Sequence, residues 1–203
     1  MGPEDSPDKM LPPDQYAIDK LLRWGIDHPS LGRVPEIDLP NWRLTIGGEV
    51  QNPLVMNWDE FLKLPAVQSK SDFHCVEGWS VLDCRWEGVR FSSIVELVRP
   101  KPQAKFVTFE CADGYTTSLT LDELSGDDIV LAYKLNGKDL EKEIGGPMRL
   151  VAPSKYAYKS AMWVKAIRFT AMKEKGFWEK RGYSDSADVW KNDRRAPFGK
   201  LSF

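Results

Sequence analysis

The sequence predicts an α+β fold in which short strands dominate and the helices are few and short. Apolar and polar residues alternate in several short runs, which is the period of strands with one face buried in a sheet. Turn signals separate these runs, most clearly Gly47-Gly48 and Asn136-Gly137. Two helical patterns begin with the spacing of a capping box and are soon closed by prolines.

The N-terminal region is predicted to be a tail followed by a helix. Residues 1–13 contain four prolines and four charged residues, which predicts a flexible tail. Asp14 can cap a helix whose apolar face includes Ile18 and Leu22, and Gly25 would end it. A hairpin is predicted next, because alternation begins at Trp42, a glycine pair makes a turn, and the apolar pattern then resumes.

Capping boxes at Asn57 and Ser93 predict two short helices, which Pro65 and Pro100 close, with a strand over residues 66–75 between them. Further strands are predicted at residues 106–111, 115–121, 129–134, 148–152 and 161–171. The last of these is apolar on both faces, which predicts a strand buried on both sides.

Aromatic residues lie among charges near the C-terminal end, namely Trp178, Tyr183 and Trp190. They predict an ordered segment that wraps around the protein rather than a free tail. Residues 14–203 are therefore expected to form a single domain that includes this C-terminal wrap.

Composition and charge exclude several classes of protein. The 203 residues carry 28 Lys and Arg against 30 Asp and Glu, so the net charge is −2, whereas a nucleic-acid binder needs a basic face. No run of about 18 apolar residues occurs, which predicts no membrane span. Cys75, Cys84 and Cys111 are too few for a disulfide framework, and the N-terminus lacks the pattern of a signal peptide. These features predict a cytoplasmic protein.

Common catalytic motifs are absent from the sequence. His28 and His74 are the two histidines, the cysteines lack zinc-site spacing, and no nucleophile elbow, phosphate loop or dinucleotide fingerprint occurs. Three polar clusters remain as candidate sites, at residues 73–80, 145–153 and 155–163.

Each cluster has a structural and a functional interpretation. Cys75 lies at a strand end, where a free cysteine is more often a small buried hydrophobe than a ligand. Arg149 lies inside an apolar strand and needs either a buried carboxylate partner or a bound anion. Lys155 and Lys159 could hold a phosphate together with nearby backbone N–H groups, or they form a solvated basic loop.

Taken in order, the runs 74–80, 113–117 and 145–163 resemble the molybdopterin-binding domain of the sulfite oxidase family. The resemblance is closest to its small single-domain bacterial and archaeal members, to which the run 176–183 is also similar. It covers roughly residues 40–190. It implies a β-rich mixed-sheet domain of the sulfite oxidase molybdopterin-binding type with short helices, and molybdenum and molybdopterin as cofactors.

The resemblance also implies roles for individual residues. Cys75 matches the family's molybdenum-ligating cysteine, and Tyr115 matches a pocket tyrosine beside the metal. Arg149 matches a cofactor-binding arginine, and Cys111 falls near a further cofactor contact. The loop that would hold the pterin phosphate, much of it through backbone groups, contains Lys159, Ser160, Ala161 and Met162.

The activity implied is a two-electron transfer of an oxygen atom on a small-molecule substrate, which is an S-oxide, an N-oxide or a sulfite-like molecule. Electrons would be exchanged with a separate donor or acceptor protein. Sulfite oxidases carry an arginine where this chain has Ser80, and the run 76–80 is more similar to the bacterial methionine-sulfoxide reductase branch. Trp79 and Tyr115 predict a partly aromatic pocket suited to a neutral oxide.

Two alternatives stay open. The first is a binding or scaffold module that kept the fold and lost the cofactor, which the presence of Cys75 and Arg149 disfavours. The second is a hydrolase that pairs Cys75 with His74, which is disfavoured because neighbours on a strand point to opposite faces. The sequence makes no prediction of the oligomeric state.

Overall fold

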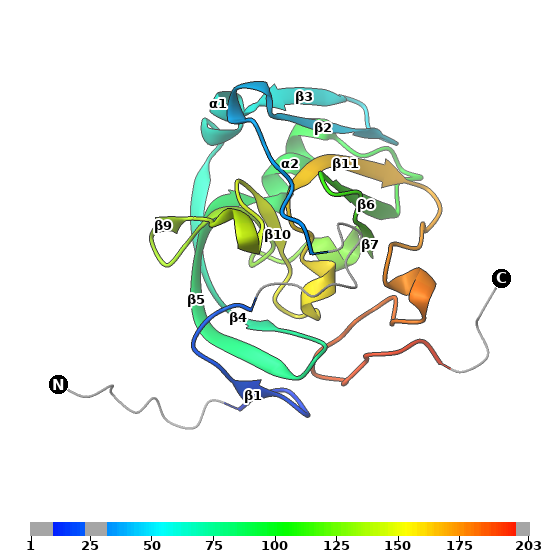
Figure 1. The fold of residues 1–203 in the computed structure, drawn as a ribbon. Helices are drawn as coiled ribbons and strands as arrows, with labels where there is room; N and C mark the ends of the chain where they lie inside the picture. The colour runs from blue at the N-terminus through cyan, green and yellow to red at the C-terminus, as the bar shows by residue number, and fades with distance from the viewer. Residues whose placement is uncertain (1–9, 23–31, 198–203) are drawn as a thin grey trace.

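The computed structural model describes residues 10–22 and 32–197, and within them two sheets carry the fold (Figure 1). The six-stranded sheet is built around the long strand β5, which pairs with β4 and β8 antiparallel and with β1 parallel; β8 in turn pairs with β9 and β10. Its strands are β1 Tyr16–Ala17, β4 Ala66–His74, β5 Trp79–Arg90, β8 Val130–Leu135, β9 Lys138–Asp139 and β10 Arg149–Val151.

The five-stranded sheet has the order β3-β2-β11-β6-β7 and mixes parallel and antiparallel pairs. Its strands are β2 Arg43–Gly48, β3 Leu54–Asn57, β6 Phe106–Cys111, β7 Thr116–Thr120 and β11 Val164–Thr170. These mixed sheets with few helices confirm the predicted fold class. The prediction that residues 161–171 are buried on both faces is wrong, because Lys165 is exposed and Arg168 pairs with carboxylates at the surface.

The helices are short, as predicted, and one of the two predicted caps is present. In α1 (Trp58–Leu62), Asn57 and Glu60 form the complete capping box. The predicted cap at Ser93 is wrong, because α2 (Phe91–Val98) begins directly at the end of β5, and the backbone N–H of Phe91 donates to the Ile129 carbonyl instead. Short 3₁₀ turns occur at Leu39–Asn41, Asp122–Leu124, Lys142–Ile144, Ala157–Lys159 and Glu179–Arg181.

The helix predicted from Asp14 is absent from residues 14–22. The N–H of Tyr16 donates to the Gly78 carbonyl and that of Ile18 to the Ser80 carbonyl, so this backbone pairs with the edge of the sheet as β1. Gly25 and the predicted tail up to residue 9 lie outside the described residues. Across those described, the structure has no helix with both the length and the apolar character needed to cross a membrane.

The segment from residue 171 to residue 197, called the C-terminal segment below, runs along the 154–162 loop without joining either sheet (Figure 1). Bridges join Lys155 to Asp188 and Tyr183 to Arg195, and the Tyr156 N–H donates to the Ala187 carbonyl. Over the described residues, the C-terminal segment thus packs on this loop, and it supplies one wall of the site.

Candidate active site

A cavity of about 220 Å³ opens where the turn between β4 and β5, strand β10, the 157–162 loop and the C-terminal segment meet. Its walls are largely apolar and aromatic. Six of the predicted site residues line it, namely Cys75, Tyr115, Arg149, Ser160, Ala161 and Met162. The structure therefore brings together residues that are far apart in the sequence.

Cys75 is held at one side of the cavity by the turn that joins β4 to β5. Its N–H donates to the Trp79 carbonyl at 2.8 Å, and its carbonyl accepts from Gly78, whose φ of 105° suits glycine. Its Sγ lies 3.9 Å from Glu77 Oε2. Burial raises the pKa of the thiol to about 12, and the Glu77 charge adds to this rise. A metal ion bound here would deprotonate the sulfur.

Arg149 lines the cavity and is 3% exposed. Its terminal nitrogens donate to the carbonyls of Ile144 at 2.7 Å and Ser160 at 3.1 Å, and its Cζ lies 4.7 Å from the centre of the Phe73 ring. Across the described residues no carboxylate pairs with it, and its Nε has no hydrogen-bond partner. Burial lowers the pKa of the guanidinium to about 10. Among the described residues, no carboxylate therefore compensates the positive charge of this buried side chain.

The 157–162 loop presents small side chains and backbone to the cavity at Ser160 and Ala161. Lys159, which is predicted to contact the cofactor, is not among the residues that line the cavity. Its ammonium is fully buried and donates to Glu179 Oε1 at 2.5 Å and to the Ser118 carbonyl at 2.9 Å. Lys155, the second lysine of this cluster, pairs with Glu123 at 2.6 Å.

Cys111 and Tyr115 are two further predicted site residues, and they differ from each other in whether they line the cavity. Cys111 is buried in the core at the end of β6 and is not among the cavity-lining residues, so its cofactor contact stays a prediction that the cavity does not support. Tyr115 does line the cavity, but its hydroxyl donates to the Tyr158 carbonyl at 2.5 Å. That bond orients the ring as part of the wall. All three cysteines are free thiols, as predicted.

Sequence reasoning assigned no role to several lining residues. Glu77 lies in the run 74–80, and Trp178 and Tyr183 lie in the run 176–183. Both runs carry the family resemblance, and this is the sequence signal that points to these three residues. Ser80 does not line the cavity. Its hydroxyl bonds to His74 Nδ1 at 2.7 Å and to Gln15 at 2.8 Å.

These residues fit a cofactor that carries both a metal and negative charge. Thiolate is a soft ligand suited to a redox-active metal. The described residues contain no group of three His, Cys, Asp or Glu side chains able to hold a metal ion. A metal at Cys75 must therefore take its other ligands from a non-protein group, whose charge Arg149 would neutralise.

The fold and the site thus define a metal-cofactor oxidoreductase. The family model described as "Oxidoreductase molybdopterin binding domain" matches residues 31–178, and the chain belongs to this family. It is accordingly a molybdopterin-dependent enzyme with molybdenum as its metal, which confirms the predicted family, cofactor and enzyme class.

Several known proteins are similar to this chain. It is 40% identical to "Uncharacterized oxidoreductase YuiH" of Bacillus subtilis over 77% of this chain and 79% of that protein. It is 34% identical to the "Putative protein-methionine-sulfoxide reductase subunit YedZ1" of Azospira oryzae, over 74% of this chain and 57% of that protein. It is 32% identical to the "Protein-methionine-sulfoxide reductase catalytic subunit MsrP" of Campylobacter jejuni, over 68% of this chain and 52% of that protein.

The chain therefore spans little more than half the length of the two reductase subunits. Among solved structures, the sulfane dehydrogenase SoxCD from Paracoccus pantotrophus has a similar fold, with a TM-score of 0.67 and 22% identity over 83% of this chain and 47% of that one. That likeness supports the fold of the cofactor-binding domain.

Proposed function

We propose that this protein reduces a neutral S-oxide to the corresponding sulfide, using two electrons from a separate donor protein. The overall reaction is R₂SO + 2 e⁻ + 2 H⁺ → R₂S + H₂O. When bound, the molybdenum cofactor would supply the electron pair and the site of oxygen transfer. The protein's part is to hold that cofactor, to shape the substrate pocket and to exclude anions from it.

The charge beside Cys75 is the observation that carries the choice of substrate. Of the described lining residues, Glu77 and Arg149 are the charged ones, and the Glu77 carboxylate lies 3.9 Å from the sulfur. The Trp79 indole donates to the same carboxylate at 3.3 Å and helps to hold it there. An anion bound beside this sulfur would be repelled by the carboxylate, and a separation of about 4 Å would cost it about 1 kcal/mol in bulk water and more near a protein surface. Sulfite is therefore disfavoured and a neutral oxide is not.

One described cation acts on Cys75 from outside the cavity lining: Arg194 donates to the Val76 carbonyl, and its charge lowers the pKa of the Cys75 thiol, but it is not among the residues that line the cavity. Ser80 faces His74 rather than the cavity, while Arg90 pairs with Asp127 at the surface at 3.5 Å. Arg149 lines the cavity, but its terminal nitrogens are already bound to carbonyl groups. These placements support the prediction that sulfite lacks a binding partner here.

The walls around the cavity suit organic groups. Phe73 and Trp79 lie 6.3 Å apart between ring centres, and Trp178 and Tyr183 lie 5.1 Å apart on the opposite segment. Aromatic walls with few polar groups bind neutral ligands through apolar contact. The names of two relatives, a methionine-sulfoxide reductase catalytic subunit and a putative subunit of such a reductase, support the same substrate chemistry.

Kinetics on the molybdenum-loaded protein test the proposal. With a reduced dye as electron donor, we expect turnover of dimethyl sulfoxide or methionine sulfoxide, and little oxidation of sulfite when an acceptor dye is supplied. A sulfite kcat/KM of roughly 10⁵ M⁻¹s⁻¹ or more would overturn it. Elemental analysis comes first, because protein without molybdenum from a cofactor-competent host would favour the scaffold alternative. The cytoplasmic location stays a prediction that cell fractionation can check.

A further inference from the structure

A fully buried ion pair lies behind the cavity wall. Lys159 Nζ and Glu179 Oε1 are 2.5 Å apart, and both side chains are 0% exposed. The same carboxylate oxygen accepts from Thr117 Oγ1 at 2.7 Å, and the lysine also donates to the Ser118 carbonyl at 2.9 Å. The pair therefore joins the 157–162 loop and the C-terminal segment to strand β7.

Each partner is next in sequence to a residue that lines the cavity. Lys159 precedes Ser160, whose carbonyl accepts from Arg149 at 3.1 Å. Glu179 follows Trp178, which forms part of the opposite wall. A movement of either charged side chain would therefore move backbone that faces the cofactor.

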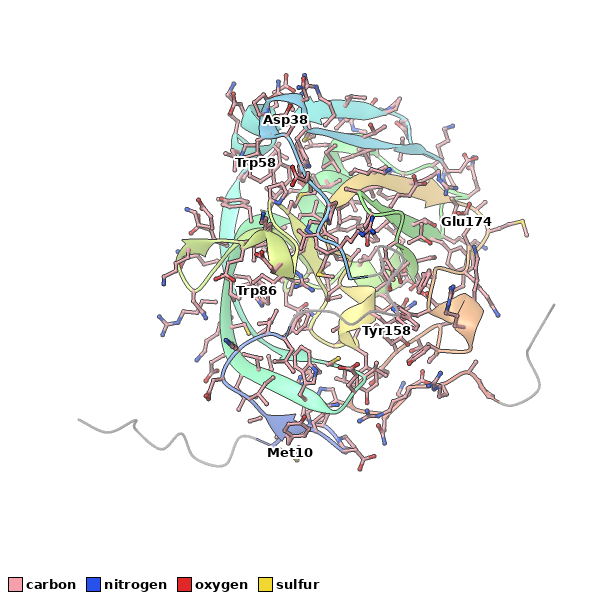
Figure 2. All side chains as sticks on the ribbon, in the orientation of Figure 1. Met10, Asp38, Trp58, Trp86, Tyr158 and Glu174 are labelled. Carbon is pink, nitrogen blue, oxygen red and sulfur yellow. The ribbon has the colours of Figure 1, made fainter. Side chains whose placement is uncertain are left out.

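The C-terminal segment is fitted closely at this point. A Cβ on Gly176 would lie 2.3 Å from the Thr116 carbonyl oxygen and 2.7 Å from Glu179 Oε2, so no side chain is tolerated there. The Phe177 N–H donates to the same Thr116 carbonyl at 2.8 Å. Figure 2 labels Tyr158 on the adjoining loop, and its hydroxyl donates to the Ser184 carbonyl of the segment at 2.7 Å.

Fold stability alone is a poor explanation for this pair. Burying two charges costs more solvation than their attraction commonly returns, and well-packed apolar replacements are often as stable. Within the described residues, Glu179 Oε2 also lacks a hydrogen-bond partner, which adds to the cost. What the pair supplies is a fixed geometry between two segments.

We propose that Lys159 and Glu179 are positioning residues for the molybdopterin cofactor. Their ion pair fixes the C-terminal segment against the 157–162 loop, so that the Ser160 carbonyl and the Trp178 wall keep the spacing that retains the cofactor. Lys159 thus acts on the cofactor through the backbone, with no contact from its ammonium. The proposal concerns cofactor retention and is independent of the substrate.

The test compares cofactor loss with fold stability in three variants of the loaded protein: Lys159→Met, Glu179→Gln and the double variant Lys159→Met/Glu179→Leu. Released molybdopterin is followed as its fluorescent oxidation product, bound molybdenum by elemental analysis, and unfolding by circular dichroism. We expect the double variant to unfold near the parent's temperature yet to lose cofactor about tenfold faster or more, the range seen when residues that orient metal ligands are removed.

The Lys155→Met/Glu123→Leu variant is the matched control, because that ion pair lies on the same loop but joins it to the 122–124 turn rather than to the C-terminal segment. We expect the control to change the unfolding temperature without changing the rate of cofactor loss. Any folded variant of the Lys159 pair that retains cofactor like the parent would overturn the proposal. Failure of all three variants to fold would assign the pair to the fold as a whole and would also overturn it.

Discussion

The guanidinium of Arg149 lies over the ring of Phe73, with 4.7 Å between Cζ and the ring centre, and this stacking holds a positive charge in the wall of a largely apolar cavity. Trp86 lies on the same guanidinium at 5.8 Å. Aromatic faces attract a cation but do not neutralise it. The charge of Arg149 is thus left without a carboxylate partner among the described residues, and we propose that the cofactor neutralises it.

The first prediction concerns the two roles of Arg149. Arg149→Met should lower molybdopterin occupancy about tenfold under limiting cofactor, since a charge-assisted bond is worth roughly 1.5–3 kcal/mol. The same change should leave the cofactor-free protein as stable or more stable by about 1 kcal/mol, because a desolvated charge without a carboxylate partner is removed. Elemental analysis and urea unfolding measure the two effects.

Arg90→Ala is the control for that prediction, because this arginine pairs with Asp127 at the surface. It should change neither occupancy nor stability by more than about 0.5 kcal/mol. Full loading of the Arg149→Met protein would show that the buried cation has no cofactor role.

The second prediction concerns Cys75. Cys75→Ala removes the sole proposed protein ligand of the metal and should abolish turnover of any oxide. The fold should be intact, because the side chain is only partly buried and its backbone bonds to Trp79 and Gly78 do not involve sulfur. Circular dichroism checks that the fold is intact, and molybdenum analysis checks that the metal is lost. Cys84→Ala is the matched control, because Cys84 does not line the cavity. An active Cys75→Ala enzyme would contradict the assignment of the metal ligand.

Much of this fold could be predicted from sequence because its signals are local. The capping box at Asn57 and the Asn136-Gly137 turn are confirmed, since each depends on neighbouring residues alone. Strand β5 escaped prediction because it carries Asp83 with a φ of 54° and a register shift beside Gly88, which interrupt the alternation. The strand β1 depends on pairing with a distant edge and overrides a local helical pattern.

The candidate site was predictable to a similar degree. Cys75 reaches the cavity because it directly follows the end of β4, and Arg149 reaches it because it is the first residue of β10. The sequence could not show that Lys159 turns away, because its direction depends on a 3₁₀ turn and on Glu179, which lies 20 residues further along the chain. Cys111 faces the core because its side of β6 packs inward, and the sequence does not show which side of the strand that is.

The third prediction concerns acid stability and the Lys155–Glu123 pair. Burial alone would raise the pKa of Glu123, but hydrogen bonds from Lys155 and Thr120 hold it below the usual 4.5. A carboxyl with a lower pKa in the folded state stabilises the protein above its unfolded pKa and loses that contribution as the pH falls. Glu123→Gln should therefore destabilise the protein at pH 7, by roughly 1 kcal/mol or less because the pair is partly screened.

That difference should shrink as the pH falls below about 4.5, where the wild-type carboxyl also begins to be neutralised. Urea unfolding of both proteins at neutral and acidic pH measures it. A difference that is constant with pH would mean that the charge on Glu123 contributes nothing.

The fourth prediction concerns Glu77 and the choice of substrate. Glu77→Gln removes the negative charge 3.9 Å from the sulfur of Cys75, the proposed metal ligand, while keeping the shape of the side chain. We expect the kcat/KM for sulfite to rise relative to that for a neutral S-oxide by about fivefold, the equivalent of about 1 kcal/mol of repulsion. Because Glu77 is exposed, the gain should be smaller at high salt, where mobile ions already screen its charge.

Asp83→Asn is the matched control for this prediction. That carboxylate pairs with Lys70 at 3.0 Å, on the two strands β4 and β5 that the turn with Glu77 joins, but it does not line the cavity. Steady-state kinetics with both substrates at two ionic strengths decide the matter: an unchanged substrate ratio in Glu77→Gln, or an equal change in Asp83→Asn, would show that the carboxylate beside Cys75 does not select the substrate.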